Sequence, residues 1–502
     1  MTTDEPRAEA RAMPILLGAA SLAILYTGCY LGHPALPGNR PGYPLGWWSW
    51  FDQGNYLRSA QHLRALDLAP AFHWYPVGYA LLAAPFTRLL PMHAFYFVDL
   101  AALLAAYLGF LSFARRLSVR ALWAVPIFVL SSVADRDLLA TWAEPWNTTA
   151  SAGAIWLFLA LMAAEMTAGE LAPERLLRLA AIGALGAAIG AIRPSDTFIP
   201  ALWVGGGALH ALVARRPRWG ELGAVAIGAA AVAVPFGALY LAIYGPHPSD
   251  YVLRSRAIGF VFGQLPWKTV VLLLQPRPWF PDGAGLAARF PWLVLAFAGI
   301  LPAAWMARGG ARLAVVLLAA SLVLYWALFF SYVDLLPSGL WRYHNVHYFK
   351  WTWPGLGLFA FLWLRAVAGQ ARRLAVASLA AVFLLMCIRL TPVEVADAVS
   401  ARMVQFAAGS PSWDAVYFGD YQLADAAGML RNVEAVRGMP DATGVREIAL
   451  RRPFEGAVRF VDSNDARAVA PGAPLHRWAA RMSLGYPCWL PPRPCRRLAP
   501  RD

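Results

Sequence analysis

Residues 221–244 read ELGAVAIGAAAVAVPFGALYLAIY, and this stretch decides the class of fold. Only its first residue is charged, and the run exceeds the roughly 20 mainly apolar residues with which a helix crosses a bilayer. Its apolar residues do not alternate with polar ones, which favours a spanning helix over a strand of a membrane barrel. The stretch therefore predicts a transmembrane helix.

Further apolar runs of the same kind lie on both sides of this stretch. The composition agrees, because 59% of the 502 residues are hydrophobic and only 14% are charged, against about 25% in soluble domains. We therefore expect an all-α polytopic membrane bundle of about 11 transmembrane helices, multi-pass in the inner (plasma) membrane. The expected spans are residues 13–31, 92–114, 119–134, 145–164, 177–192, 196–214, 221–244, 290–307, 312–333, 351–368 and 372–390.

Arginine-rich connections set the expected orientation of the bundle. The net charge is +14, and in a membrane protein such an excess ordinarily holds loops in the cytoplasm, so we expect no nucleic-acid partner. Short connections dense in arginine occur at residues 114–120 (ARRLSVR), 214–218 (ARRPR), 307–312 (ARGGAR) and 365–373 (RAVAGQARR). Alternation from these connections places the N-terminus inside and the C-terminus outside.

This alternation divides the chain into three parts. Residues 1–12 are expected to be cytoplasmic, since no cleavage pattern of a signal peptide follows them. Residues 13–390 form the predicted transmembrane domain. Residues 391–502 mix charges with strand-like runs such as 455–461 (EGAVRFV), which predicts a small extracytoplasmic soluble domain.

The outer segments carry features of their own. In the first outer loop, 32–91, residues 54–68 place Tyr56, Ala60, Leu63 and Leu66 at helical spacing, which predicts a helix lying flat on the interface. Residues 76–90 are apolar but short, so we expect an interfacial or re-entrant helix there.

Two cysteines lie near the end of the chain in the sequence CWLPPRPC. Cys488 and Cys495 are close enough to form a disulfide outside the cytoplasm, and their spacing leaves a bridge and two free thiols equally open.

Two acidic residues follow predicted spans on the outer side. Asp52 lies in WWSWFDQGNYL, where it either caps the next helix or accepts a proton from an acceptor group. Glu144 lies in ATWAEPWNTT, where it is either an acid in the first turn of the fourth span or a functional carboxylate.

Cationic residues gather on the same expected face. Arg193 ends the fifth span, where it either reaches lipid phosphate along its apolar stem or holds the phosphate of a bound substrate. The segment WRYHNVHYFK, residues 341–350, adds Arg342, His344, His347 and Lys350, which suit a pocket for phosphate. The two histidines have no identifiable third partner for a metal ion, so we expect no metal.

Taken in chain order, these motifs resemble the GT-C superfamily of integral-membrane glycosyltransferases. The resemblance is closest to the lipid A aminoarabinose transferases and the protein O-mannosyltransferases, and it covers residues 30–370. The motifs that carry it are FDQGNY with Asp52 and Tyr56, YPVGYALLAAPF at 75–86, Glu144-Pro145, Arg193-Pro194 and RYHNVHYF at 342–349. Two positions depart from the family pattern, because Glu144 stands where aspartate is frequent and FHWY at 72–75 lacks the lysine of the aminoarabinose transferases.

The resemblance implies transfer of a sugar, with inversion, from a polyprenyl-phosphate-linked donor to an envelope lipid, glycan or protein acceptor at the outer face. In such an enzyme, Asp52 is the expected general base and Glu144 the second catalytic acid. The expected phosphate-binding residues are Arg193, Arg342, Lys350, His347 and His73, with Arg88 as an alternative to His73. The expected positioning residues are Tyr56, Tyr75 and Tyr343, and no cofactor is expected.

Two other functions remain open from the sequence. A polytopic transporter would show repeated halves and broken helices near the midplane, and neither is visible in the sequence. A non-catalytic membrane scaffold would use Asp52 and Glu144 only as helix caps.

Overall fold

Helices dominate the computed structural model of the chain. It describes residues 5–42, 44–167, 174–213, 219–260, 262, 265, 269–274, 285–332, 335, 339–342, 344–389, 402–407, 413–418, 457–462, 482–483 and 486–487. The helices are α1 (Glu5–Leu31), α2 (Phe51–Arg64), α3 (Gly78–Ala83), α4 (Tyr96–Arg116), α5 (Ala121–Ser132), α6 (Arg136–Ala143), α7 (Asn147–Thr167), α8 (Arg175–Ile192), α9 (Phe198–Val213), α10 (Trp219–Tyr244), α11 (Asp250–Ile258), α13 (Leu286–Arg289), α14 (Leu293–Met306), α15 (Gly309–Phe330), α16 (Gly339–Arg342), α17 (Thr352–Gln370) and α18 (Arg372–Arg389).

The chain is an integral membrane protein. Within the described residues, six helices are long and apolar enough to cross a membrane, and two shorter apolar helices, α5 and α14, accompany them. The six are Ala12–Leu31 of α1, α4, α7, α8, α10 and α15. Every span expected from the sequence coincides with a helix, so the polytopic helical bundle is confirmed, while the total of eleven crossings stays a prediction.

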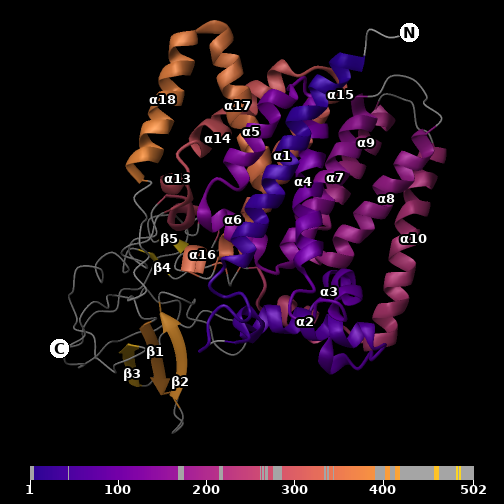
Figure 1. The fold of residues 1–502 in the computed structure, drawn as a ribbon, viewed down its shortest axis with the longest axis vertical. Coiled ribbons are helices and arrows are strands. Elements are labelled where there is room, and N and C mark those ends of the chain that lie inside the picture. The colour runs from indigo at the N-terminus through magenta and orange to yellow at the C-terminus, as the bar shows by residue number, and fades with distance from the viewer. Residues whose placement is uncertain are drawn as a thin grey trace. The chain divides into compact units, whose positions relative to one another are not determined.

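The chain divides into two compact units. The first consists of Met1–Val252, Leu293–Val323 and Val346–Val376, and the second of Leu253–Trp292, Leu324–Asn345 and Ala377–Asp502. The first unit holds α1 to α10 and most of the long helices (Figure 1).

Glycines allow helices of the first unit to pack closely. The helices α4 and α7 lie side by side, and a Cβ atom added at Gly109 would lie 2.5 Å from the backbone of Trp156. The helices α8 and α10 pair in the same way, since a Cβ atom at Gly228 would lie 1.8 Å from the carbonyl oxygen of Ala180. Close backbone approach through small residues is how helices associate in lipid, where apolar burial gives no net driving force.

One end of the first unit gathers the arginine-rich connections. Gly310, at the start of α15, packs against the backbone of Met166 near the end of α7. Arg365 near the end of α17 donates a 3.5 Å hydrogen bond to the carbonyl of Ser118, which follows α4. Three of the four connections predicted to be cytoplasmic therefore share one end, and the fourth, 214–218, lies outside the described residues.

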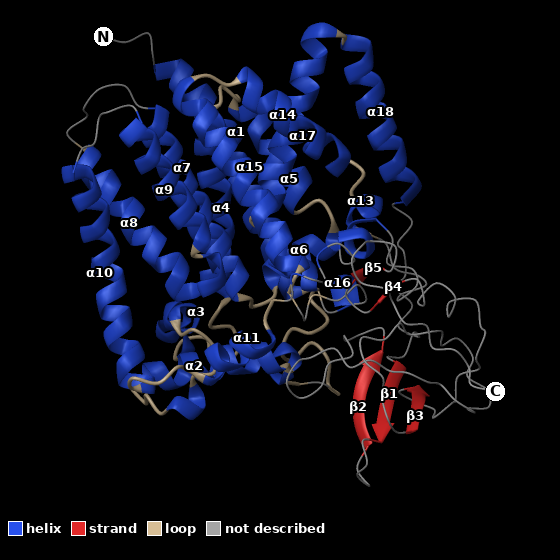
Figure 2. Ribbon diagram, turned by 180° about the vertical axis from the view of Figure 1, so that it is seen from behind, coloured by secondary structure: helices blue, strands red, loops and turns tan. Residues whose placement is uncertain are grey.

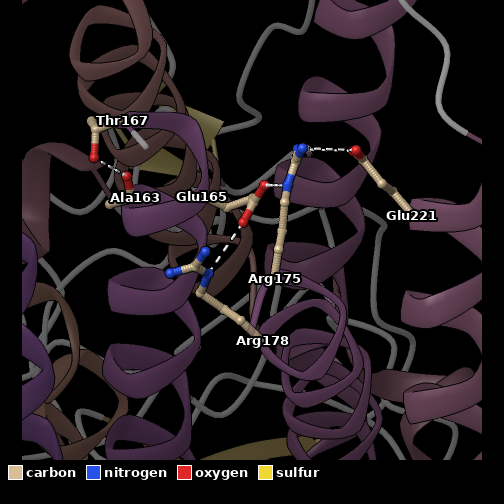
Figure 3. Close-up of polar contacts among 6 residues, drawn as sticks. All are labelled: Ala163, Glu165, Thr167, Arg175, Arg178 and Glu221. Carbon is tan, nitrogen blue, oxygen red and sulfur yellow. Dashed lines mark hydrogen bonds and ion pairs between the residues drawn. The ribbon is translucent and has the colours of Figure 1, made fainter. Parts of the chain in front are cut away.

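An ion-pair network joins three helices at this same end (Figure 3). Glu165 of α7 pairs with Arg175 and, at 3.2 Å, with Arg178, both from the first turns of α8. Arg175 also pairs with Glu221 of α10 at 2.9 Å. These ion pairs connect the ends of α7, α8 and α10 and fix the positions of the helix ends relative to one another.

The opposite end of the first unit holds the short helices of the first loop. Figure 1 shows α2 and α3 at the end of the bundle opposite the start of α1. The buried face of α2 carries Tyr56, Ala60 and Leu63, as the spacing predicts. Leu66 departs from the prediction: α2 ends at Arg64, and Leu66 adopts a left-handed conformation (φ 57°) with its side chain 84% exposed.

The apolar segment 76–90 forms α3 followed by a single 3-10 turn, Ala84–Thr87. It is far too short to span a bilayer, as expected. Further 3-10 turns are Gly46–Ser49, Pro70–Phe72, Pro194–Asp196 and Asn345–Phe349.

The second unit contains the strands (Figure 2). An antiparallel sheet has the order β2 (Trp413–Phe418), β1 (Arg402–Ala407), β3 (Ala457–Asp462), and a small hairpin joins β4 (Met482–Ser483) to β5 (Tyr486–Pro487). The described part of the strand-like run at 455–461 is a strand, β3. A π-helical turn, Thr269–Leu274, packs against α13 in the same unit. Cys488 and Cys495 lie outside the described residues.

Candidate functional site

Asp52 lies in the first turn of α2 and is only partly buried. The N-cap of α2 is Trp50, so Asp52 stands one position inside the helix. A carboxylate is favoured there by the helix dipole. The hydroxyl of Tyr75 donates a 2.5 Å hydrogen bond to Asp52 Oδ1, which ties α2 to the segment before α3. The carboxylate is therefore fixed in position while part of it still faces solvent.

Tyrosine rings surround this carboxylate. The ring of Tyr75 lies 4.9 Å from that of Tyr56 and 5.2 Å from that of Tyr251, which belongs to α11. Burial raises the pKa of Tyr56 well above its usual value, and the charge of Asp52 raises it further. Tyr56 is therefore neutral beside the acid, and Tyr75 is the tyrosine whose hydroxyl donates to it.

Arg193 is the cation of this group. It ends α8, is 5% exposed, and lies 5.0 Å over the ring of Tyr348. Its guanidinium pairs with Asp196 at 3.5 Å, and Asp196 in turn accepts a 2.5 Å hydrogen bond from Ser151. Arg193 also acts electrostatically on Tyr56, so it belongs to the Asp52 group. A buried guanidinium does not reach out to lipid phosphate, so the first of the two alternatives does not fit its position.

Gly78 makes this arrangement possible. A Cβ atom there would lie 2.4 Å from the carbonyl oxygen of Ala191 and 2.8 Å from the backbone nitrogen of Ile192. Only glycine lets α3 approach the end of α8 this closely. Gly78 of the motif YPVGYALLAAPF thus brings the first loop against Ile192, the residue that precedes Arg193.

Glu144 lies at the junction of α6 and α7 and is fully buried. It is the C-cap of α6, and α7 begins only at Asn147, so it is not an acid of the first turn of that span. His33 Nε2 lies 3.1 Å from one carboxylate oxygen, and Trp146 Nε1 donates a 2.9 Å hydrogen bond to the other. Because Ala35 N–H donates to His33 Nδ1, the hydrogen of His33 is on Nε2 and faces Glu144.

Lys350 and His347 precede α17 and face the start of α7. Lys350 Nζ donates a 2.5 Å hydrogen bond to Thr149 Oγ1 and lies 5.7 Å from the ring centre of Trp142. The ring of His347 stacks on that of Trp146 at 3.8 Å, and its Nδ1 lies 3.1 Å from Thr148 Oγ1.

Electrostatic interactions connect Lys350 with Glu144 and Arg193. Complete burial lowers the pKa of Lys350 to about 7, while the charges of Asp99 and Glu144 raise it and that of Arg193 lowers it. The charges of Glu144 and Arg193 thus affect the pKa of Lys350. The charges of Arg193 and Asp52 both affect the pKa of Tyr56. All these residues belong to the first unit.

Asp99 is the residue of this site that the sequence reasoning missed. It lies in the first turn of α4, is 1% exposed, and accepts 2.9 Å hydrogen bonds from the hydroxyl of Tyr79 on both carboxylate oxygens. The sequence did contain an indication of this site. An acidic residue within the expected span 92–114 is energetically costly in a membrane and therefore indicates a functional position.

His73 is tied into the first loop by its own contacts. Its Nε2 donates to the carbonyl of Asp67, and Ser59 lies 2.9 Å from its Nδ1. Burial lowers the pKa of His73, so the ring is a neutral cross-link. Its carbonyl accepts a hydrogen bond from Tyr244 of α10. Arg88, the alternative, is exposed at the end of the 3-10 turn after α3. We therefore leave both out of the phosphate site.

The remaining candidates are not placed. Tyr343 and the side chain of Arg342 lie outside the described residues, and His344 has a left-handed backbone (φ 53°) just before the 3-10 turn that carries His347. Among the described residues, no group of three or more His, Cys, Asp or Glu side chains is arranged to hold a metal ion.

No family model and no curated protein matches the chain. Among solved structures, it is similar to the crystal structure of ArnT from Cupriavidus metallidurans bound to undecaprenyl phosphate. The identity is 14% and the TM-score 0.48, over 75% of this chain, and the chain spans 65% of the length of that protein. That protein is an aminoarabinose transferase, one of the types of protein that the sequence motifs resemble. A likeness of this size says nothing of individual residues.

Proposed function

We propose that the protein is an inverting membrane glycosyltransferase that moves a sugar from a polyprenyl-phosphate-linked donor to an envelope acceptor on the extracytoplasmic side. One observation carries the proposal: a partly exposed carboxylate, Asp52, is held by Tyr75 next to the ring of Tyr56, on which both Asp52 and the buried guanidinium of Arg193 act electrostatically. A base next to cations suits a reaction in which an acceptor loses a proton and a phosphate leaves.

The reaction begins with the acceptor. Its hydroxyl or amine transfers a proton to Asp52 while the oxygen or nitrogen attacks the anomeric carbon of the sugar. The attack comes from the face opposite the phosphate, so the configuration inverts. Tyr56 and Tyr75 keep the carboxylate in position, and the open side of Asp52 admits the acceptor.

The leaving group is the carrier phosphate. The bond between the anomeric carbon and the phosphate oxygen breaks, and its electron pair stays on the phosphate, which gains one negative charge. Arg193 and Lys350, with His347, stabilise that charge. Buried cations that are already in place act strongly here because they need no reorganisation. The negative charge of Glu144, which is held by His33 and Trp146, favours the charged form of Lys350.

Mass spectrometry of cells tests this proposal. Lipid-linked sugars and envelope glycans are compared in cells that lack the protein and in the same cells carrying the wild type or Asp52→Asn. We expect one glycan modification to disappear and its polyprenyl-phosphate sugar to accumulate, both in the absence of the protein and with Asp52→Asn.

The rival functions give different results. A transporter or scaffold that uses Asp52 only within a helix turn would regain the wild-type glycan pattern with Asp52→Asn, because asparagine also fits the first turn of a helix. That outcome would overturn the proposal. The membrane content of the variant, measured by immunoblot, shows that it is inserted.

A further inference from the structure

The start of α7 carries three hydroxyl groups that are buried inside the first unit. The sequence there reads NTTAS, residues 147–151, and Thr148, Thr149 and Ser151 are 3%, 0% and 1% exposed. A buried hydroxyl group is costly unless it has a hydrogen-bond partner. The partners of these three groups therefore indicate what the groups do.

Two of the hydroxyls contact cationic candidates in the segment before α17. Thr149 Oγ1 accepts a 2.5 Å hydrogen bond from Lys350 Nζ. Thr148 Oγ1 lies 3.1 Å from His347 Nδ1, and the ring of His347 stacks on that of Trp146. The start of α7 thus restrains the side chains of both His347 and Lys350.

The third hydroxyl is connected to the other cation through a carboxylate. Ser151 donates a 2.5 Å hydrogen bond to Asp196 Oδ2, and Arg193 lies 3.5 Å from Asp196 Oδ1. Asp196 is 1% exposed, so Ser151 ties a buried ion pair to α7. A guanidinium and a hydroxyl donor both favour the charged form of the carboxylate that they contact. Ser151 therefore restrains Arg193 through Asp196.

A second set of contacts joins these groups independently of α7. Arg193 lies 5.0 Å over the ring of Tyr348, and the Tyr348 ring lies 4.1 Å from that of His347. Thr148 and Ser151 are three residues apart, so they share a face of α7 and are separated by about 4.5 Å along its axis. Contacts from both sides therefore bring Arg193 and His347 to one place.

Resting on the proposed function, we infer that Thr148, Thr149 and Ser151 are positioning residues, which hold the cations at the spacing that binds the phosphate group of the lipid-linked donor. The hydroxyls do not touch the phosphate in this account. They act through the cationic side chains of His347, Lys350 and Arg193. At Lys350 the hydroxyl partner is neutral, so it orients the ammonium without cancelling its positive charge.

The experiment measures carrier binding and does not depend on turnover. The full-length protein in nanodiscs receives either undecaprenyl methyl phosphate, a phosphodiester, or undecaprenol, which has the same chain and no phosphate. Native mass spectrometry measures the bound lipid. Thr149→Val removes the hydroxyl and keeps the shape of the side chain, whereas Thr149→Ser keeps the hydroxyl. Ser151→Ala tests the arm that leads to Arg193.

Ser321→Ala is the matched control for the loss of a buried hydroxyl. Ser321 of α15 is 0% exposed and accepts a 2.9 Å hydrogen bond from Nε1 of Trp203, which carries no charge. We expect this variant to melt earlier and to bind both lipids as the wild type does.

We expect Thr149→Val to bind the phosphodiester about tenfold more weakly, because the ammonium of Lys350 loses its hydroxyl partner. For Ser151→Ala, the expected weakening is about threefold or more, because Arg193 is less restrained. Thr149→Ser is expected to stay within about twofold of the wild type, since it retains the hydrogen bond. Binding of undecaprenol is expected to be unchanged in all three variants, because a positioning role affects only the phosphate.

Two results would overturn the positioning role. One is binding of the phosphodiester at wild-type strength by both Thr149→Val and Ser151→Ala, and the other is equal weakening of both lipids, which indicates a general structural role. Because the two variants act on different cations, either one is decisive if the other does not fold.

Arg193→Met and Lys350→Met separate these failures from a failure of the proposed function. If these two variants lose the preference for the phosphodiester and the hydroxyl variants keep it, the positioning role is wrong and the glycosyltransferase proposal stands. A wild type that binds the phosphodiester no more tightly than undecaprenol overturns both.

Discussion

Asp52 and Lys350 are opposite in charge and also in surroundings. Asp52 is partly exposed and accepts a hydrogen bond from Tyr75, whereas Lys350 is buried and donates a hydrogen bond to Thr149. Burial disfavours the charged form of Lys350 and lowers the pKa of this lysine to about 7. The proposed chemistry therefore depends on a buried ammonium at Lys350 that is energetically costly to keep charged.

Replacing Lys350 by methionine tests how much the buried ammonium destabilises the folded protein. We expect Lys350→Met to lose carrier binding while its thermal stability in detergent is unchanged or higher, by on the order of 1 kcal/mol, because the desolvated ammonium is removed. As a matched control, Arg178→Met removes a cation that is paired with Glu165 and is expected to lower the melting temperature.

The pH dependence of stability follows with a definite sign. Since the pKa of Lys350 is about 7 when folded and about 10.4 when unfolded, the unfolded chain binds more protons between these values. The contribution of Lys350 to stability thus rises with pH over this interval, and Lys350→Met lacks that rise. A variant that melts well below the wild type at every pH would contradict this account.

At the scale of elements, local chain signals predicted the short helices but not their ends. The apolar spacing of Tyr56, Ala60 and Leu63 predicted α2, yet the same spacing extended it to Leu66. The helix stops earlier because Leu66 turns into the left-handed region. One of the two alternatives for Glu144 placed it in the first turn of a helix, but the chain is extended there and a separate helix, α6, ends just before it.

The close approach of α3 to the end of α8 gives a prediction at this scale. We expect Gly78→Ala to lower stability by about 1–3 kcal/mol and to reduce sugar transfer, because the added methyl group pushes the chain away from Ala191 and displaces Arg193. Gly223→Ala in α10, where no atom lies within 4 Å of an added Cβ, is the matched control and should behave as wild type. Activity and melting temperature equal to wild type in Gly78→Ala would count against this positioning role.

At the scale of the whole molecule, the class of fold was predictable from composition and the site only in part. Apolar runs predict spanning helices without any knowledge of packing. Pairs such as Lys350 with Thr149, or Arg193 with Tyr348, join segments far apart in the chain. No local pattern encodes them, since they depend on which helix faces which.

Membrane orientation is the prediction that belongs to the whole first unit. The described arginine-rich connections share one end of that unit, and the positive-inside rule then places Asp52 outside. In a variant without native cysteines, Arg64→Cys in α2 and Arg308→Cys before α15, both exposed, are treated with a membrane-impermeant maleimide in intact cells. We expect labelling at position 64 only; labelling at 308 only would reverse the topology and remove the site from the outer face.

The most direct measurement is the rate of sugar transfer by the purified protein in proteoliposomes, with the donor identified by mass spectrometry. For Asp52→Asn, we expect the rate to fall by a factor of about 10² or more, the usual contribution of a general base, while carrier binding and melting temperature stay close to the wild-type values. A decrease of less than about threefold would be smaller than the contribution of a general base. Such a result would contradict the central claim that this carboxylate accepts the acceptor's proton.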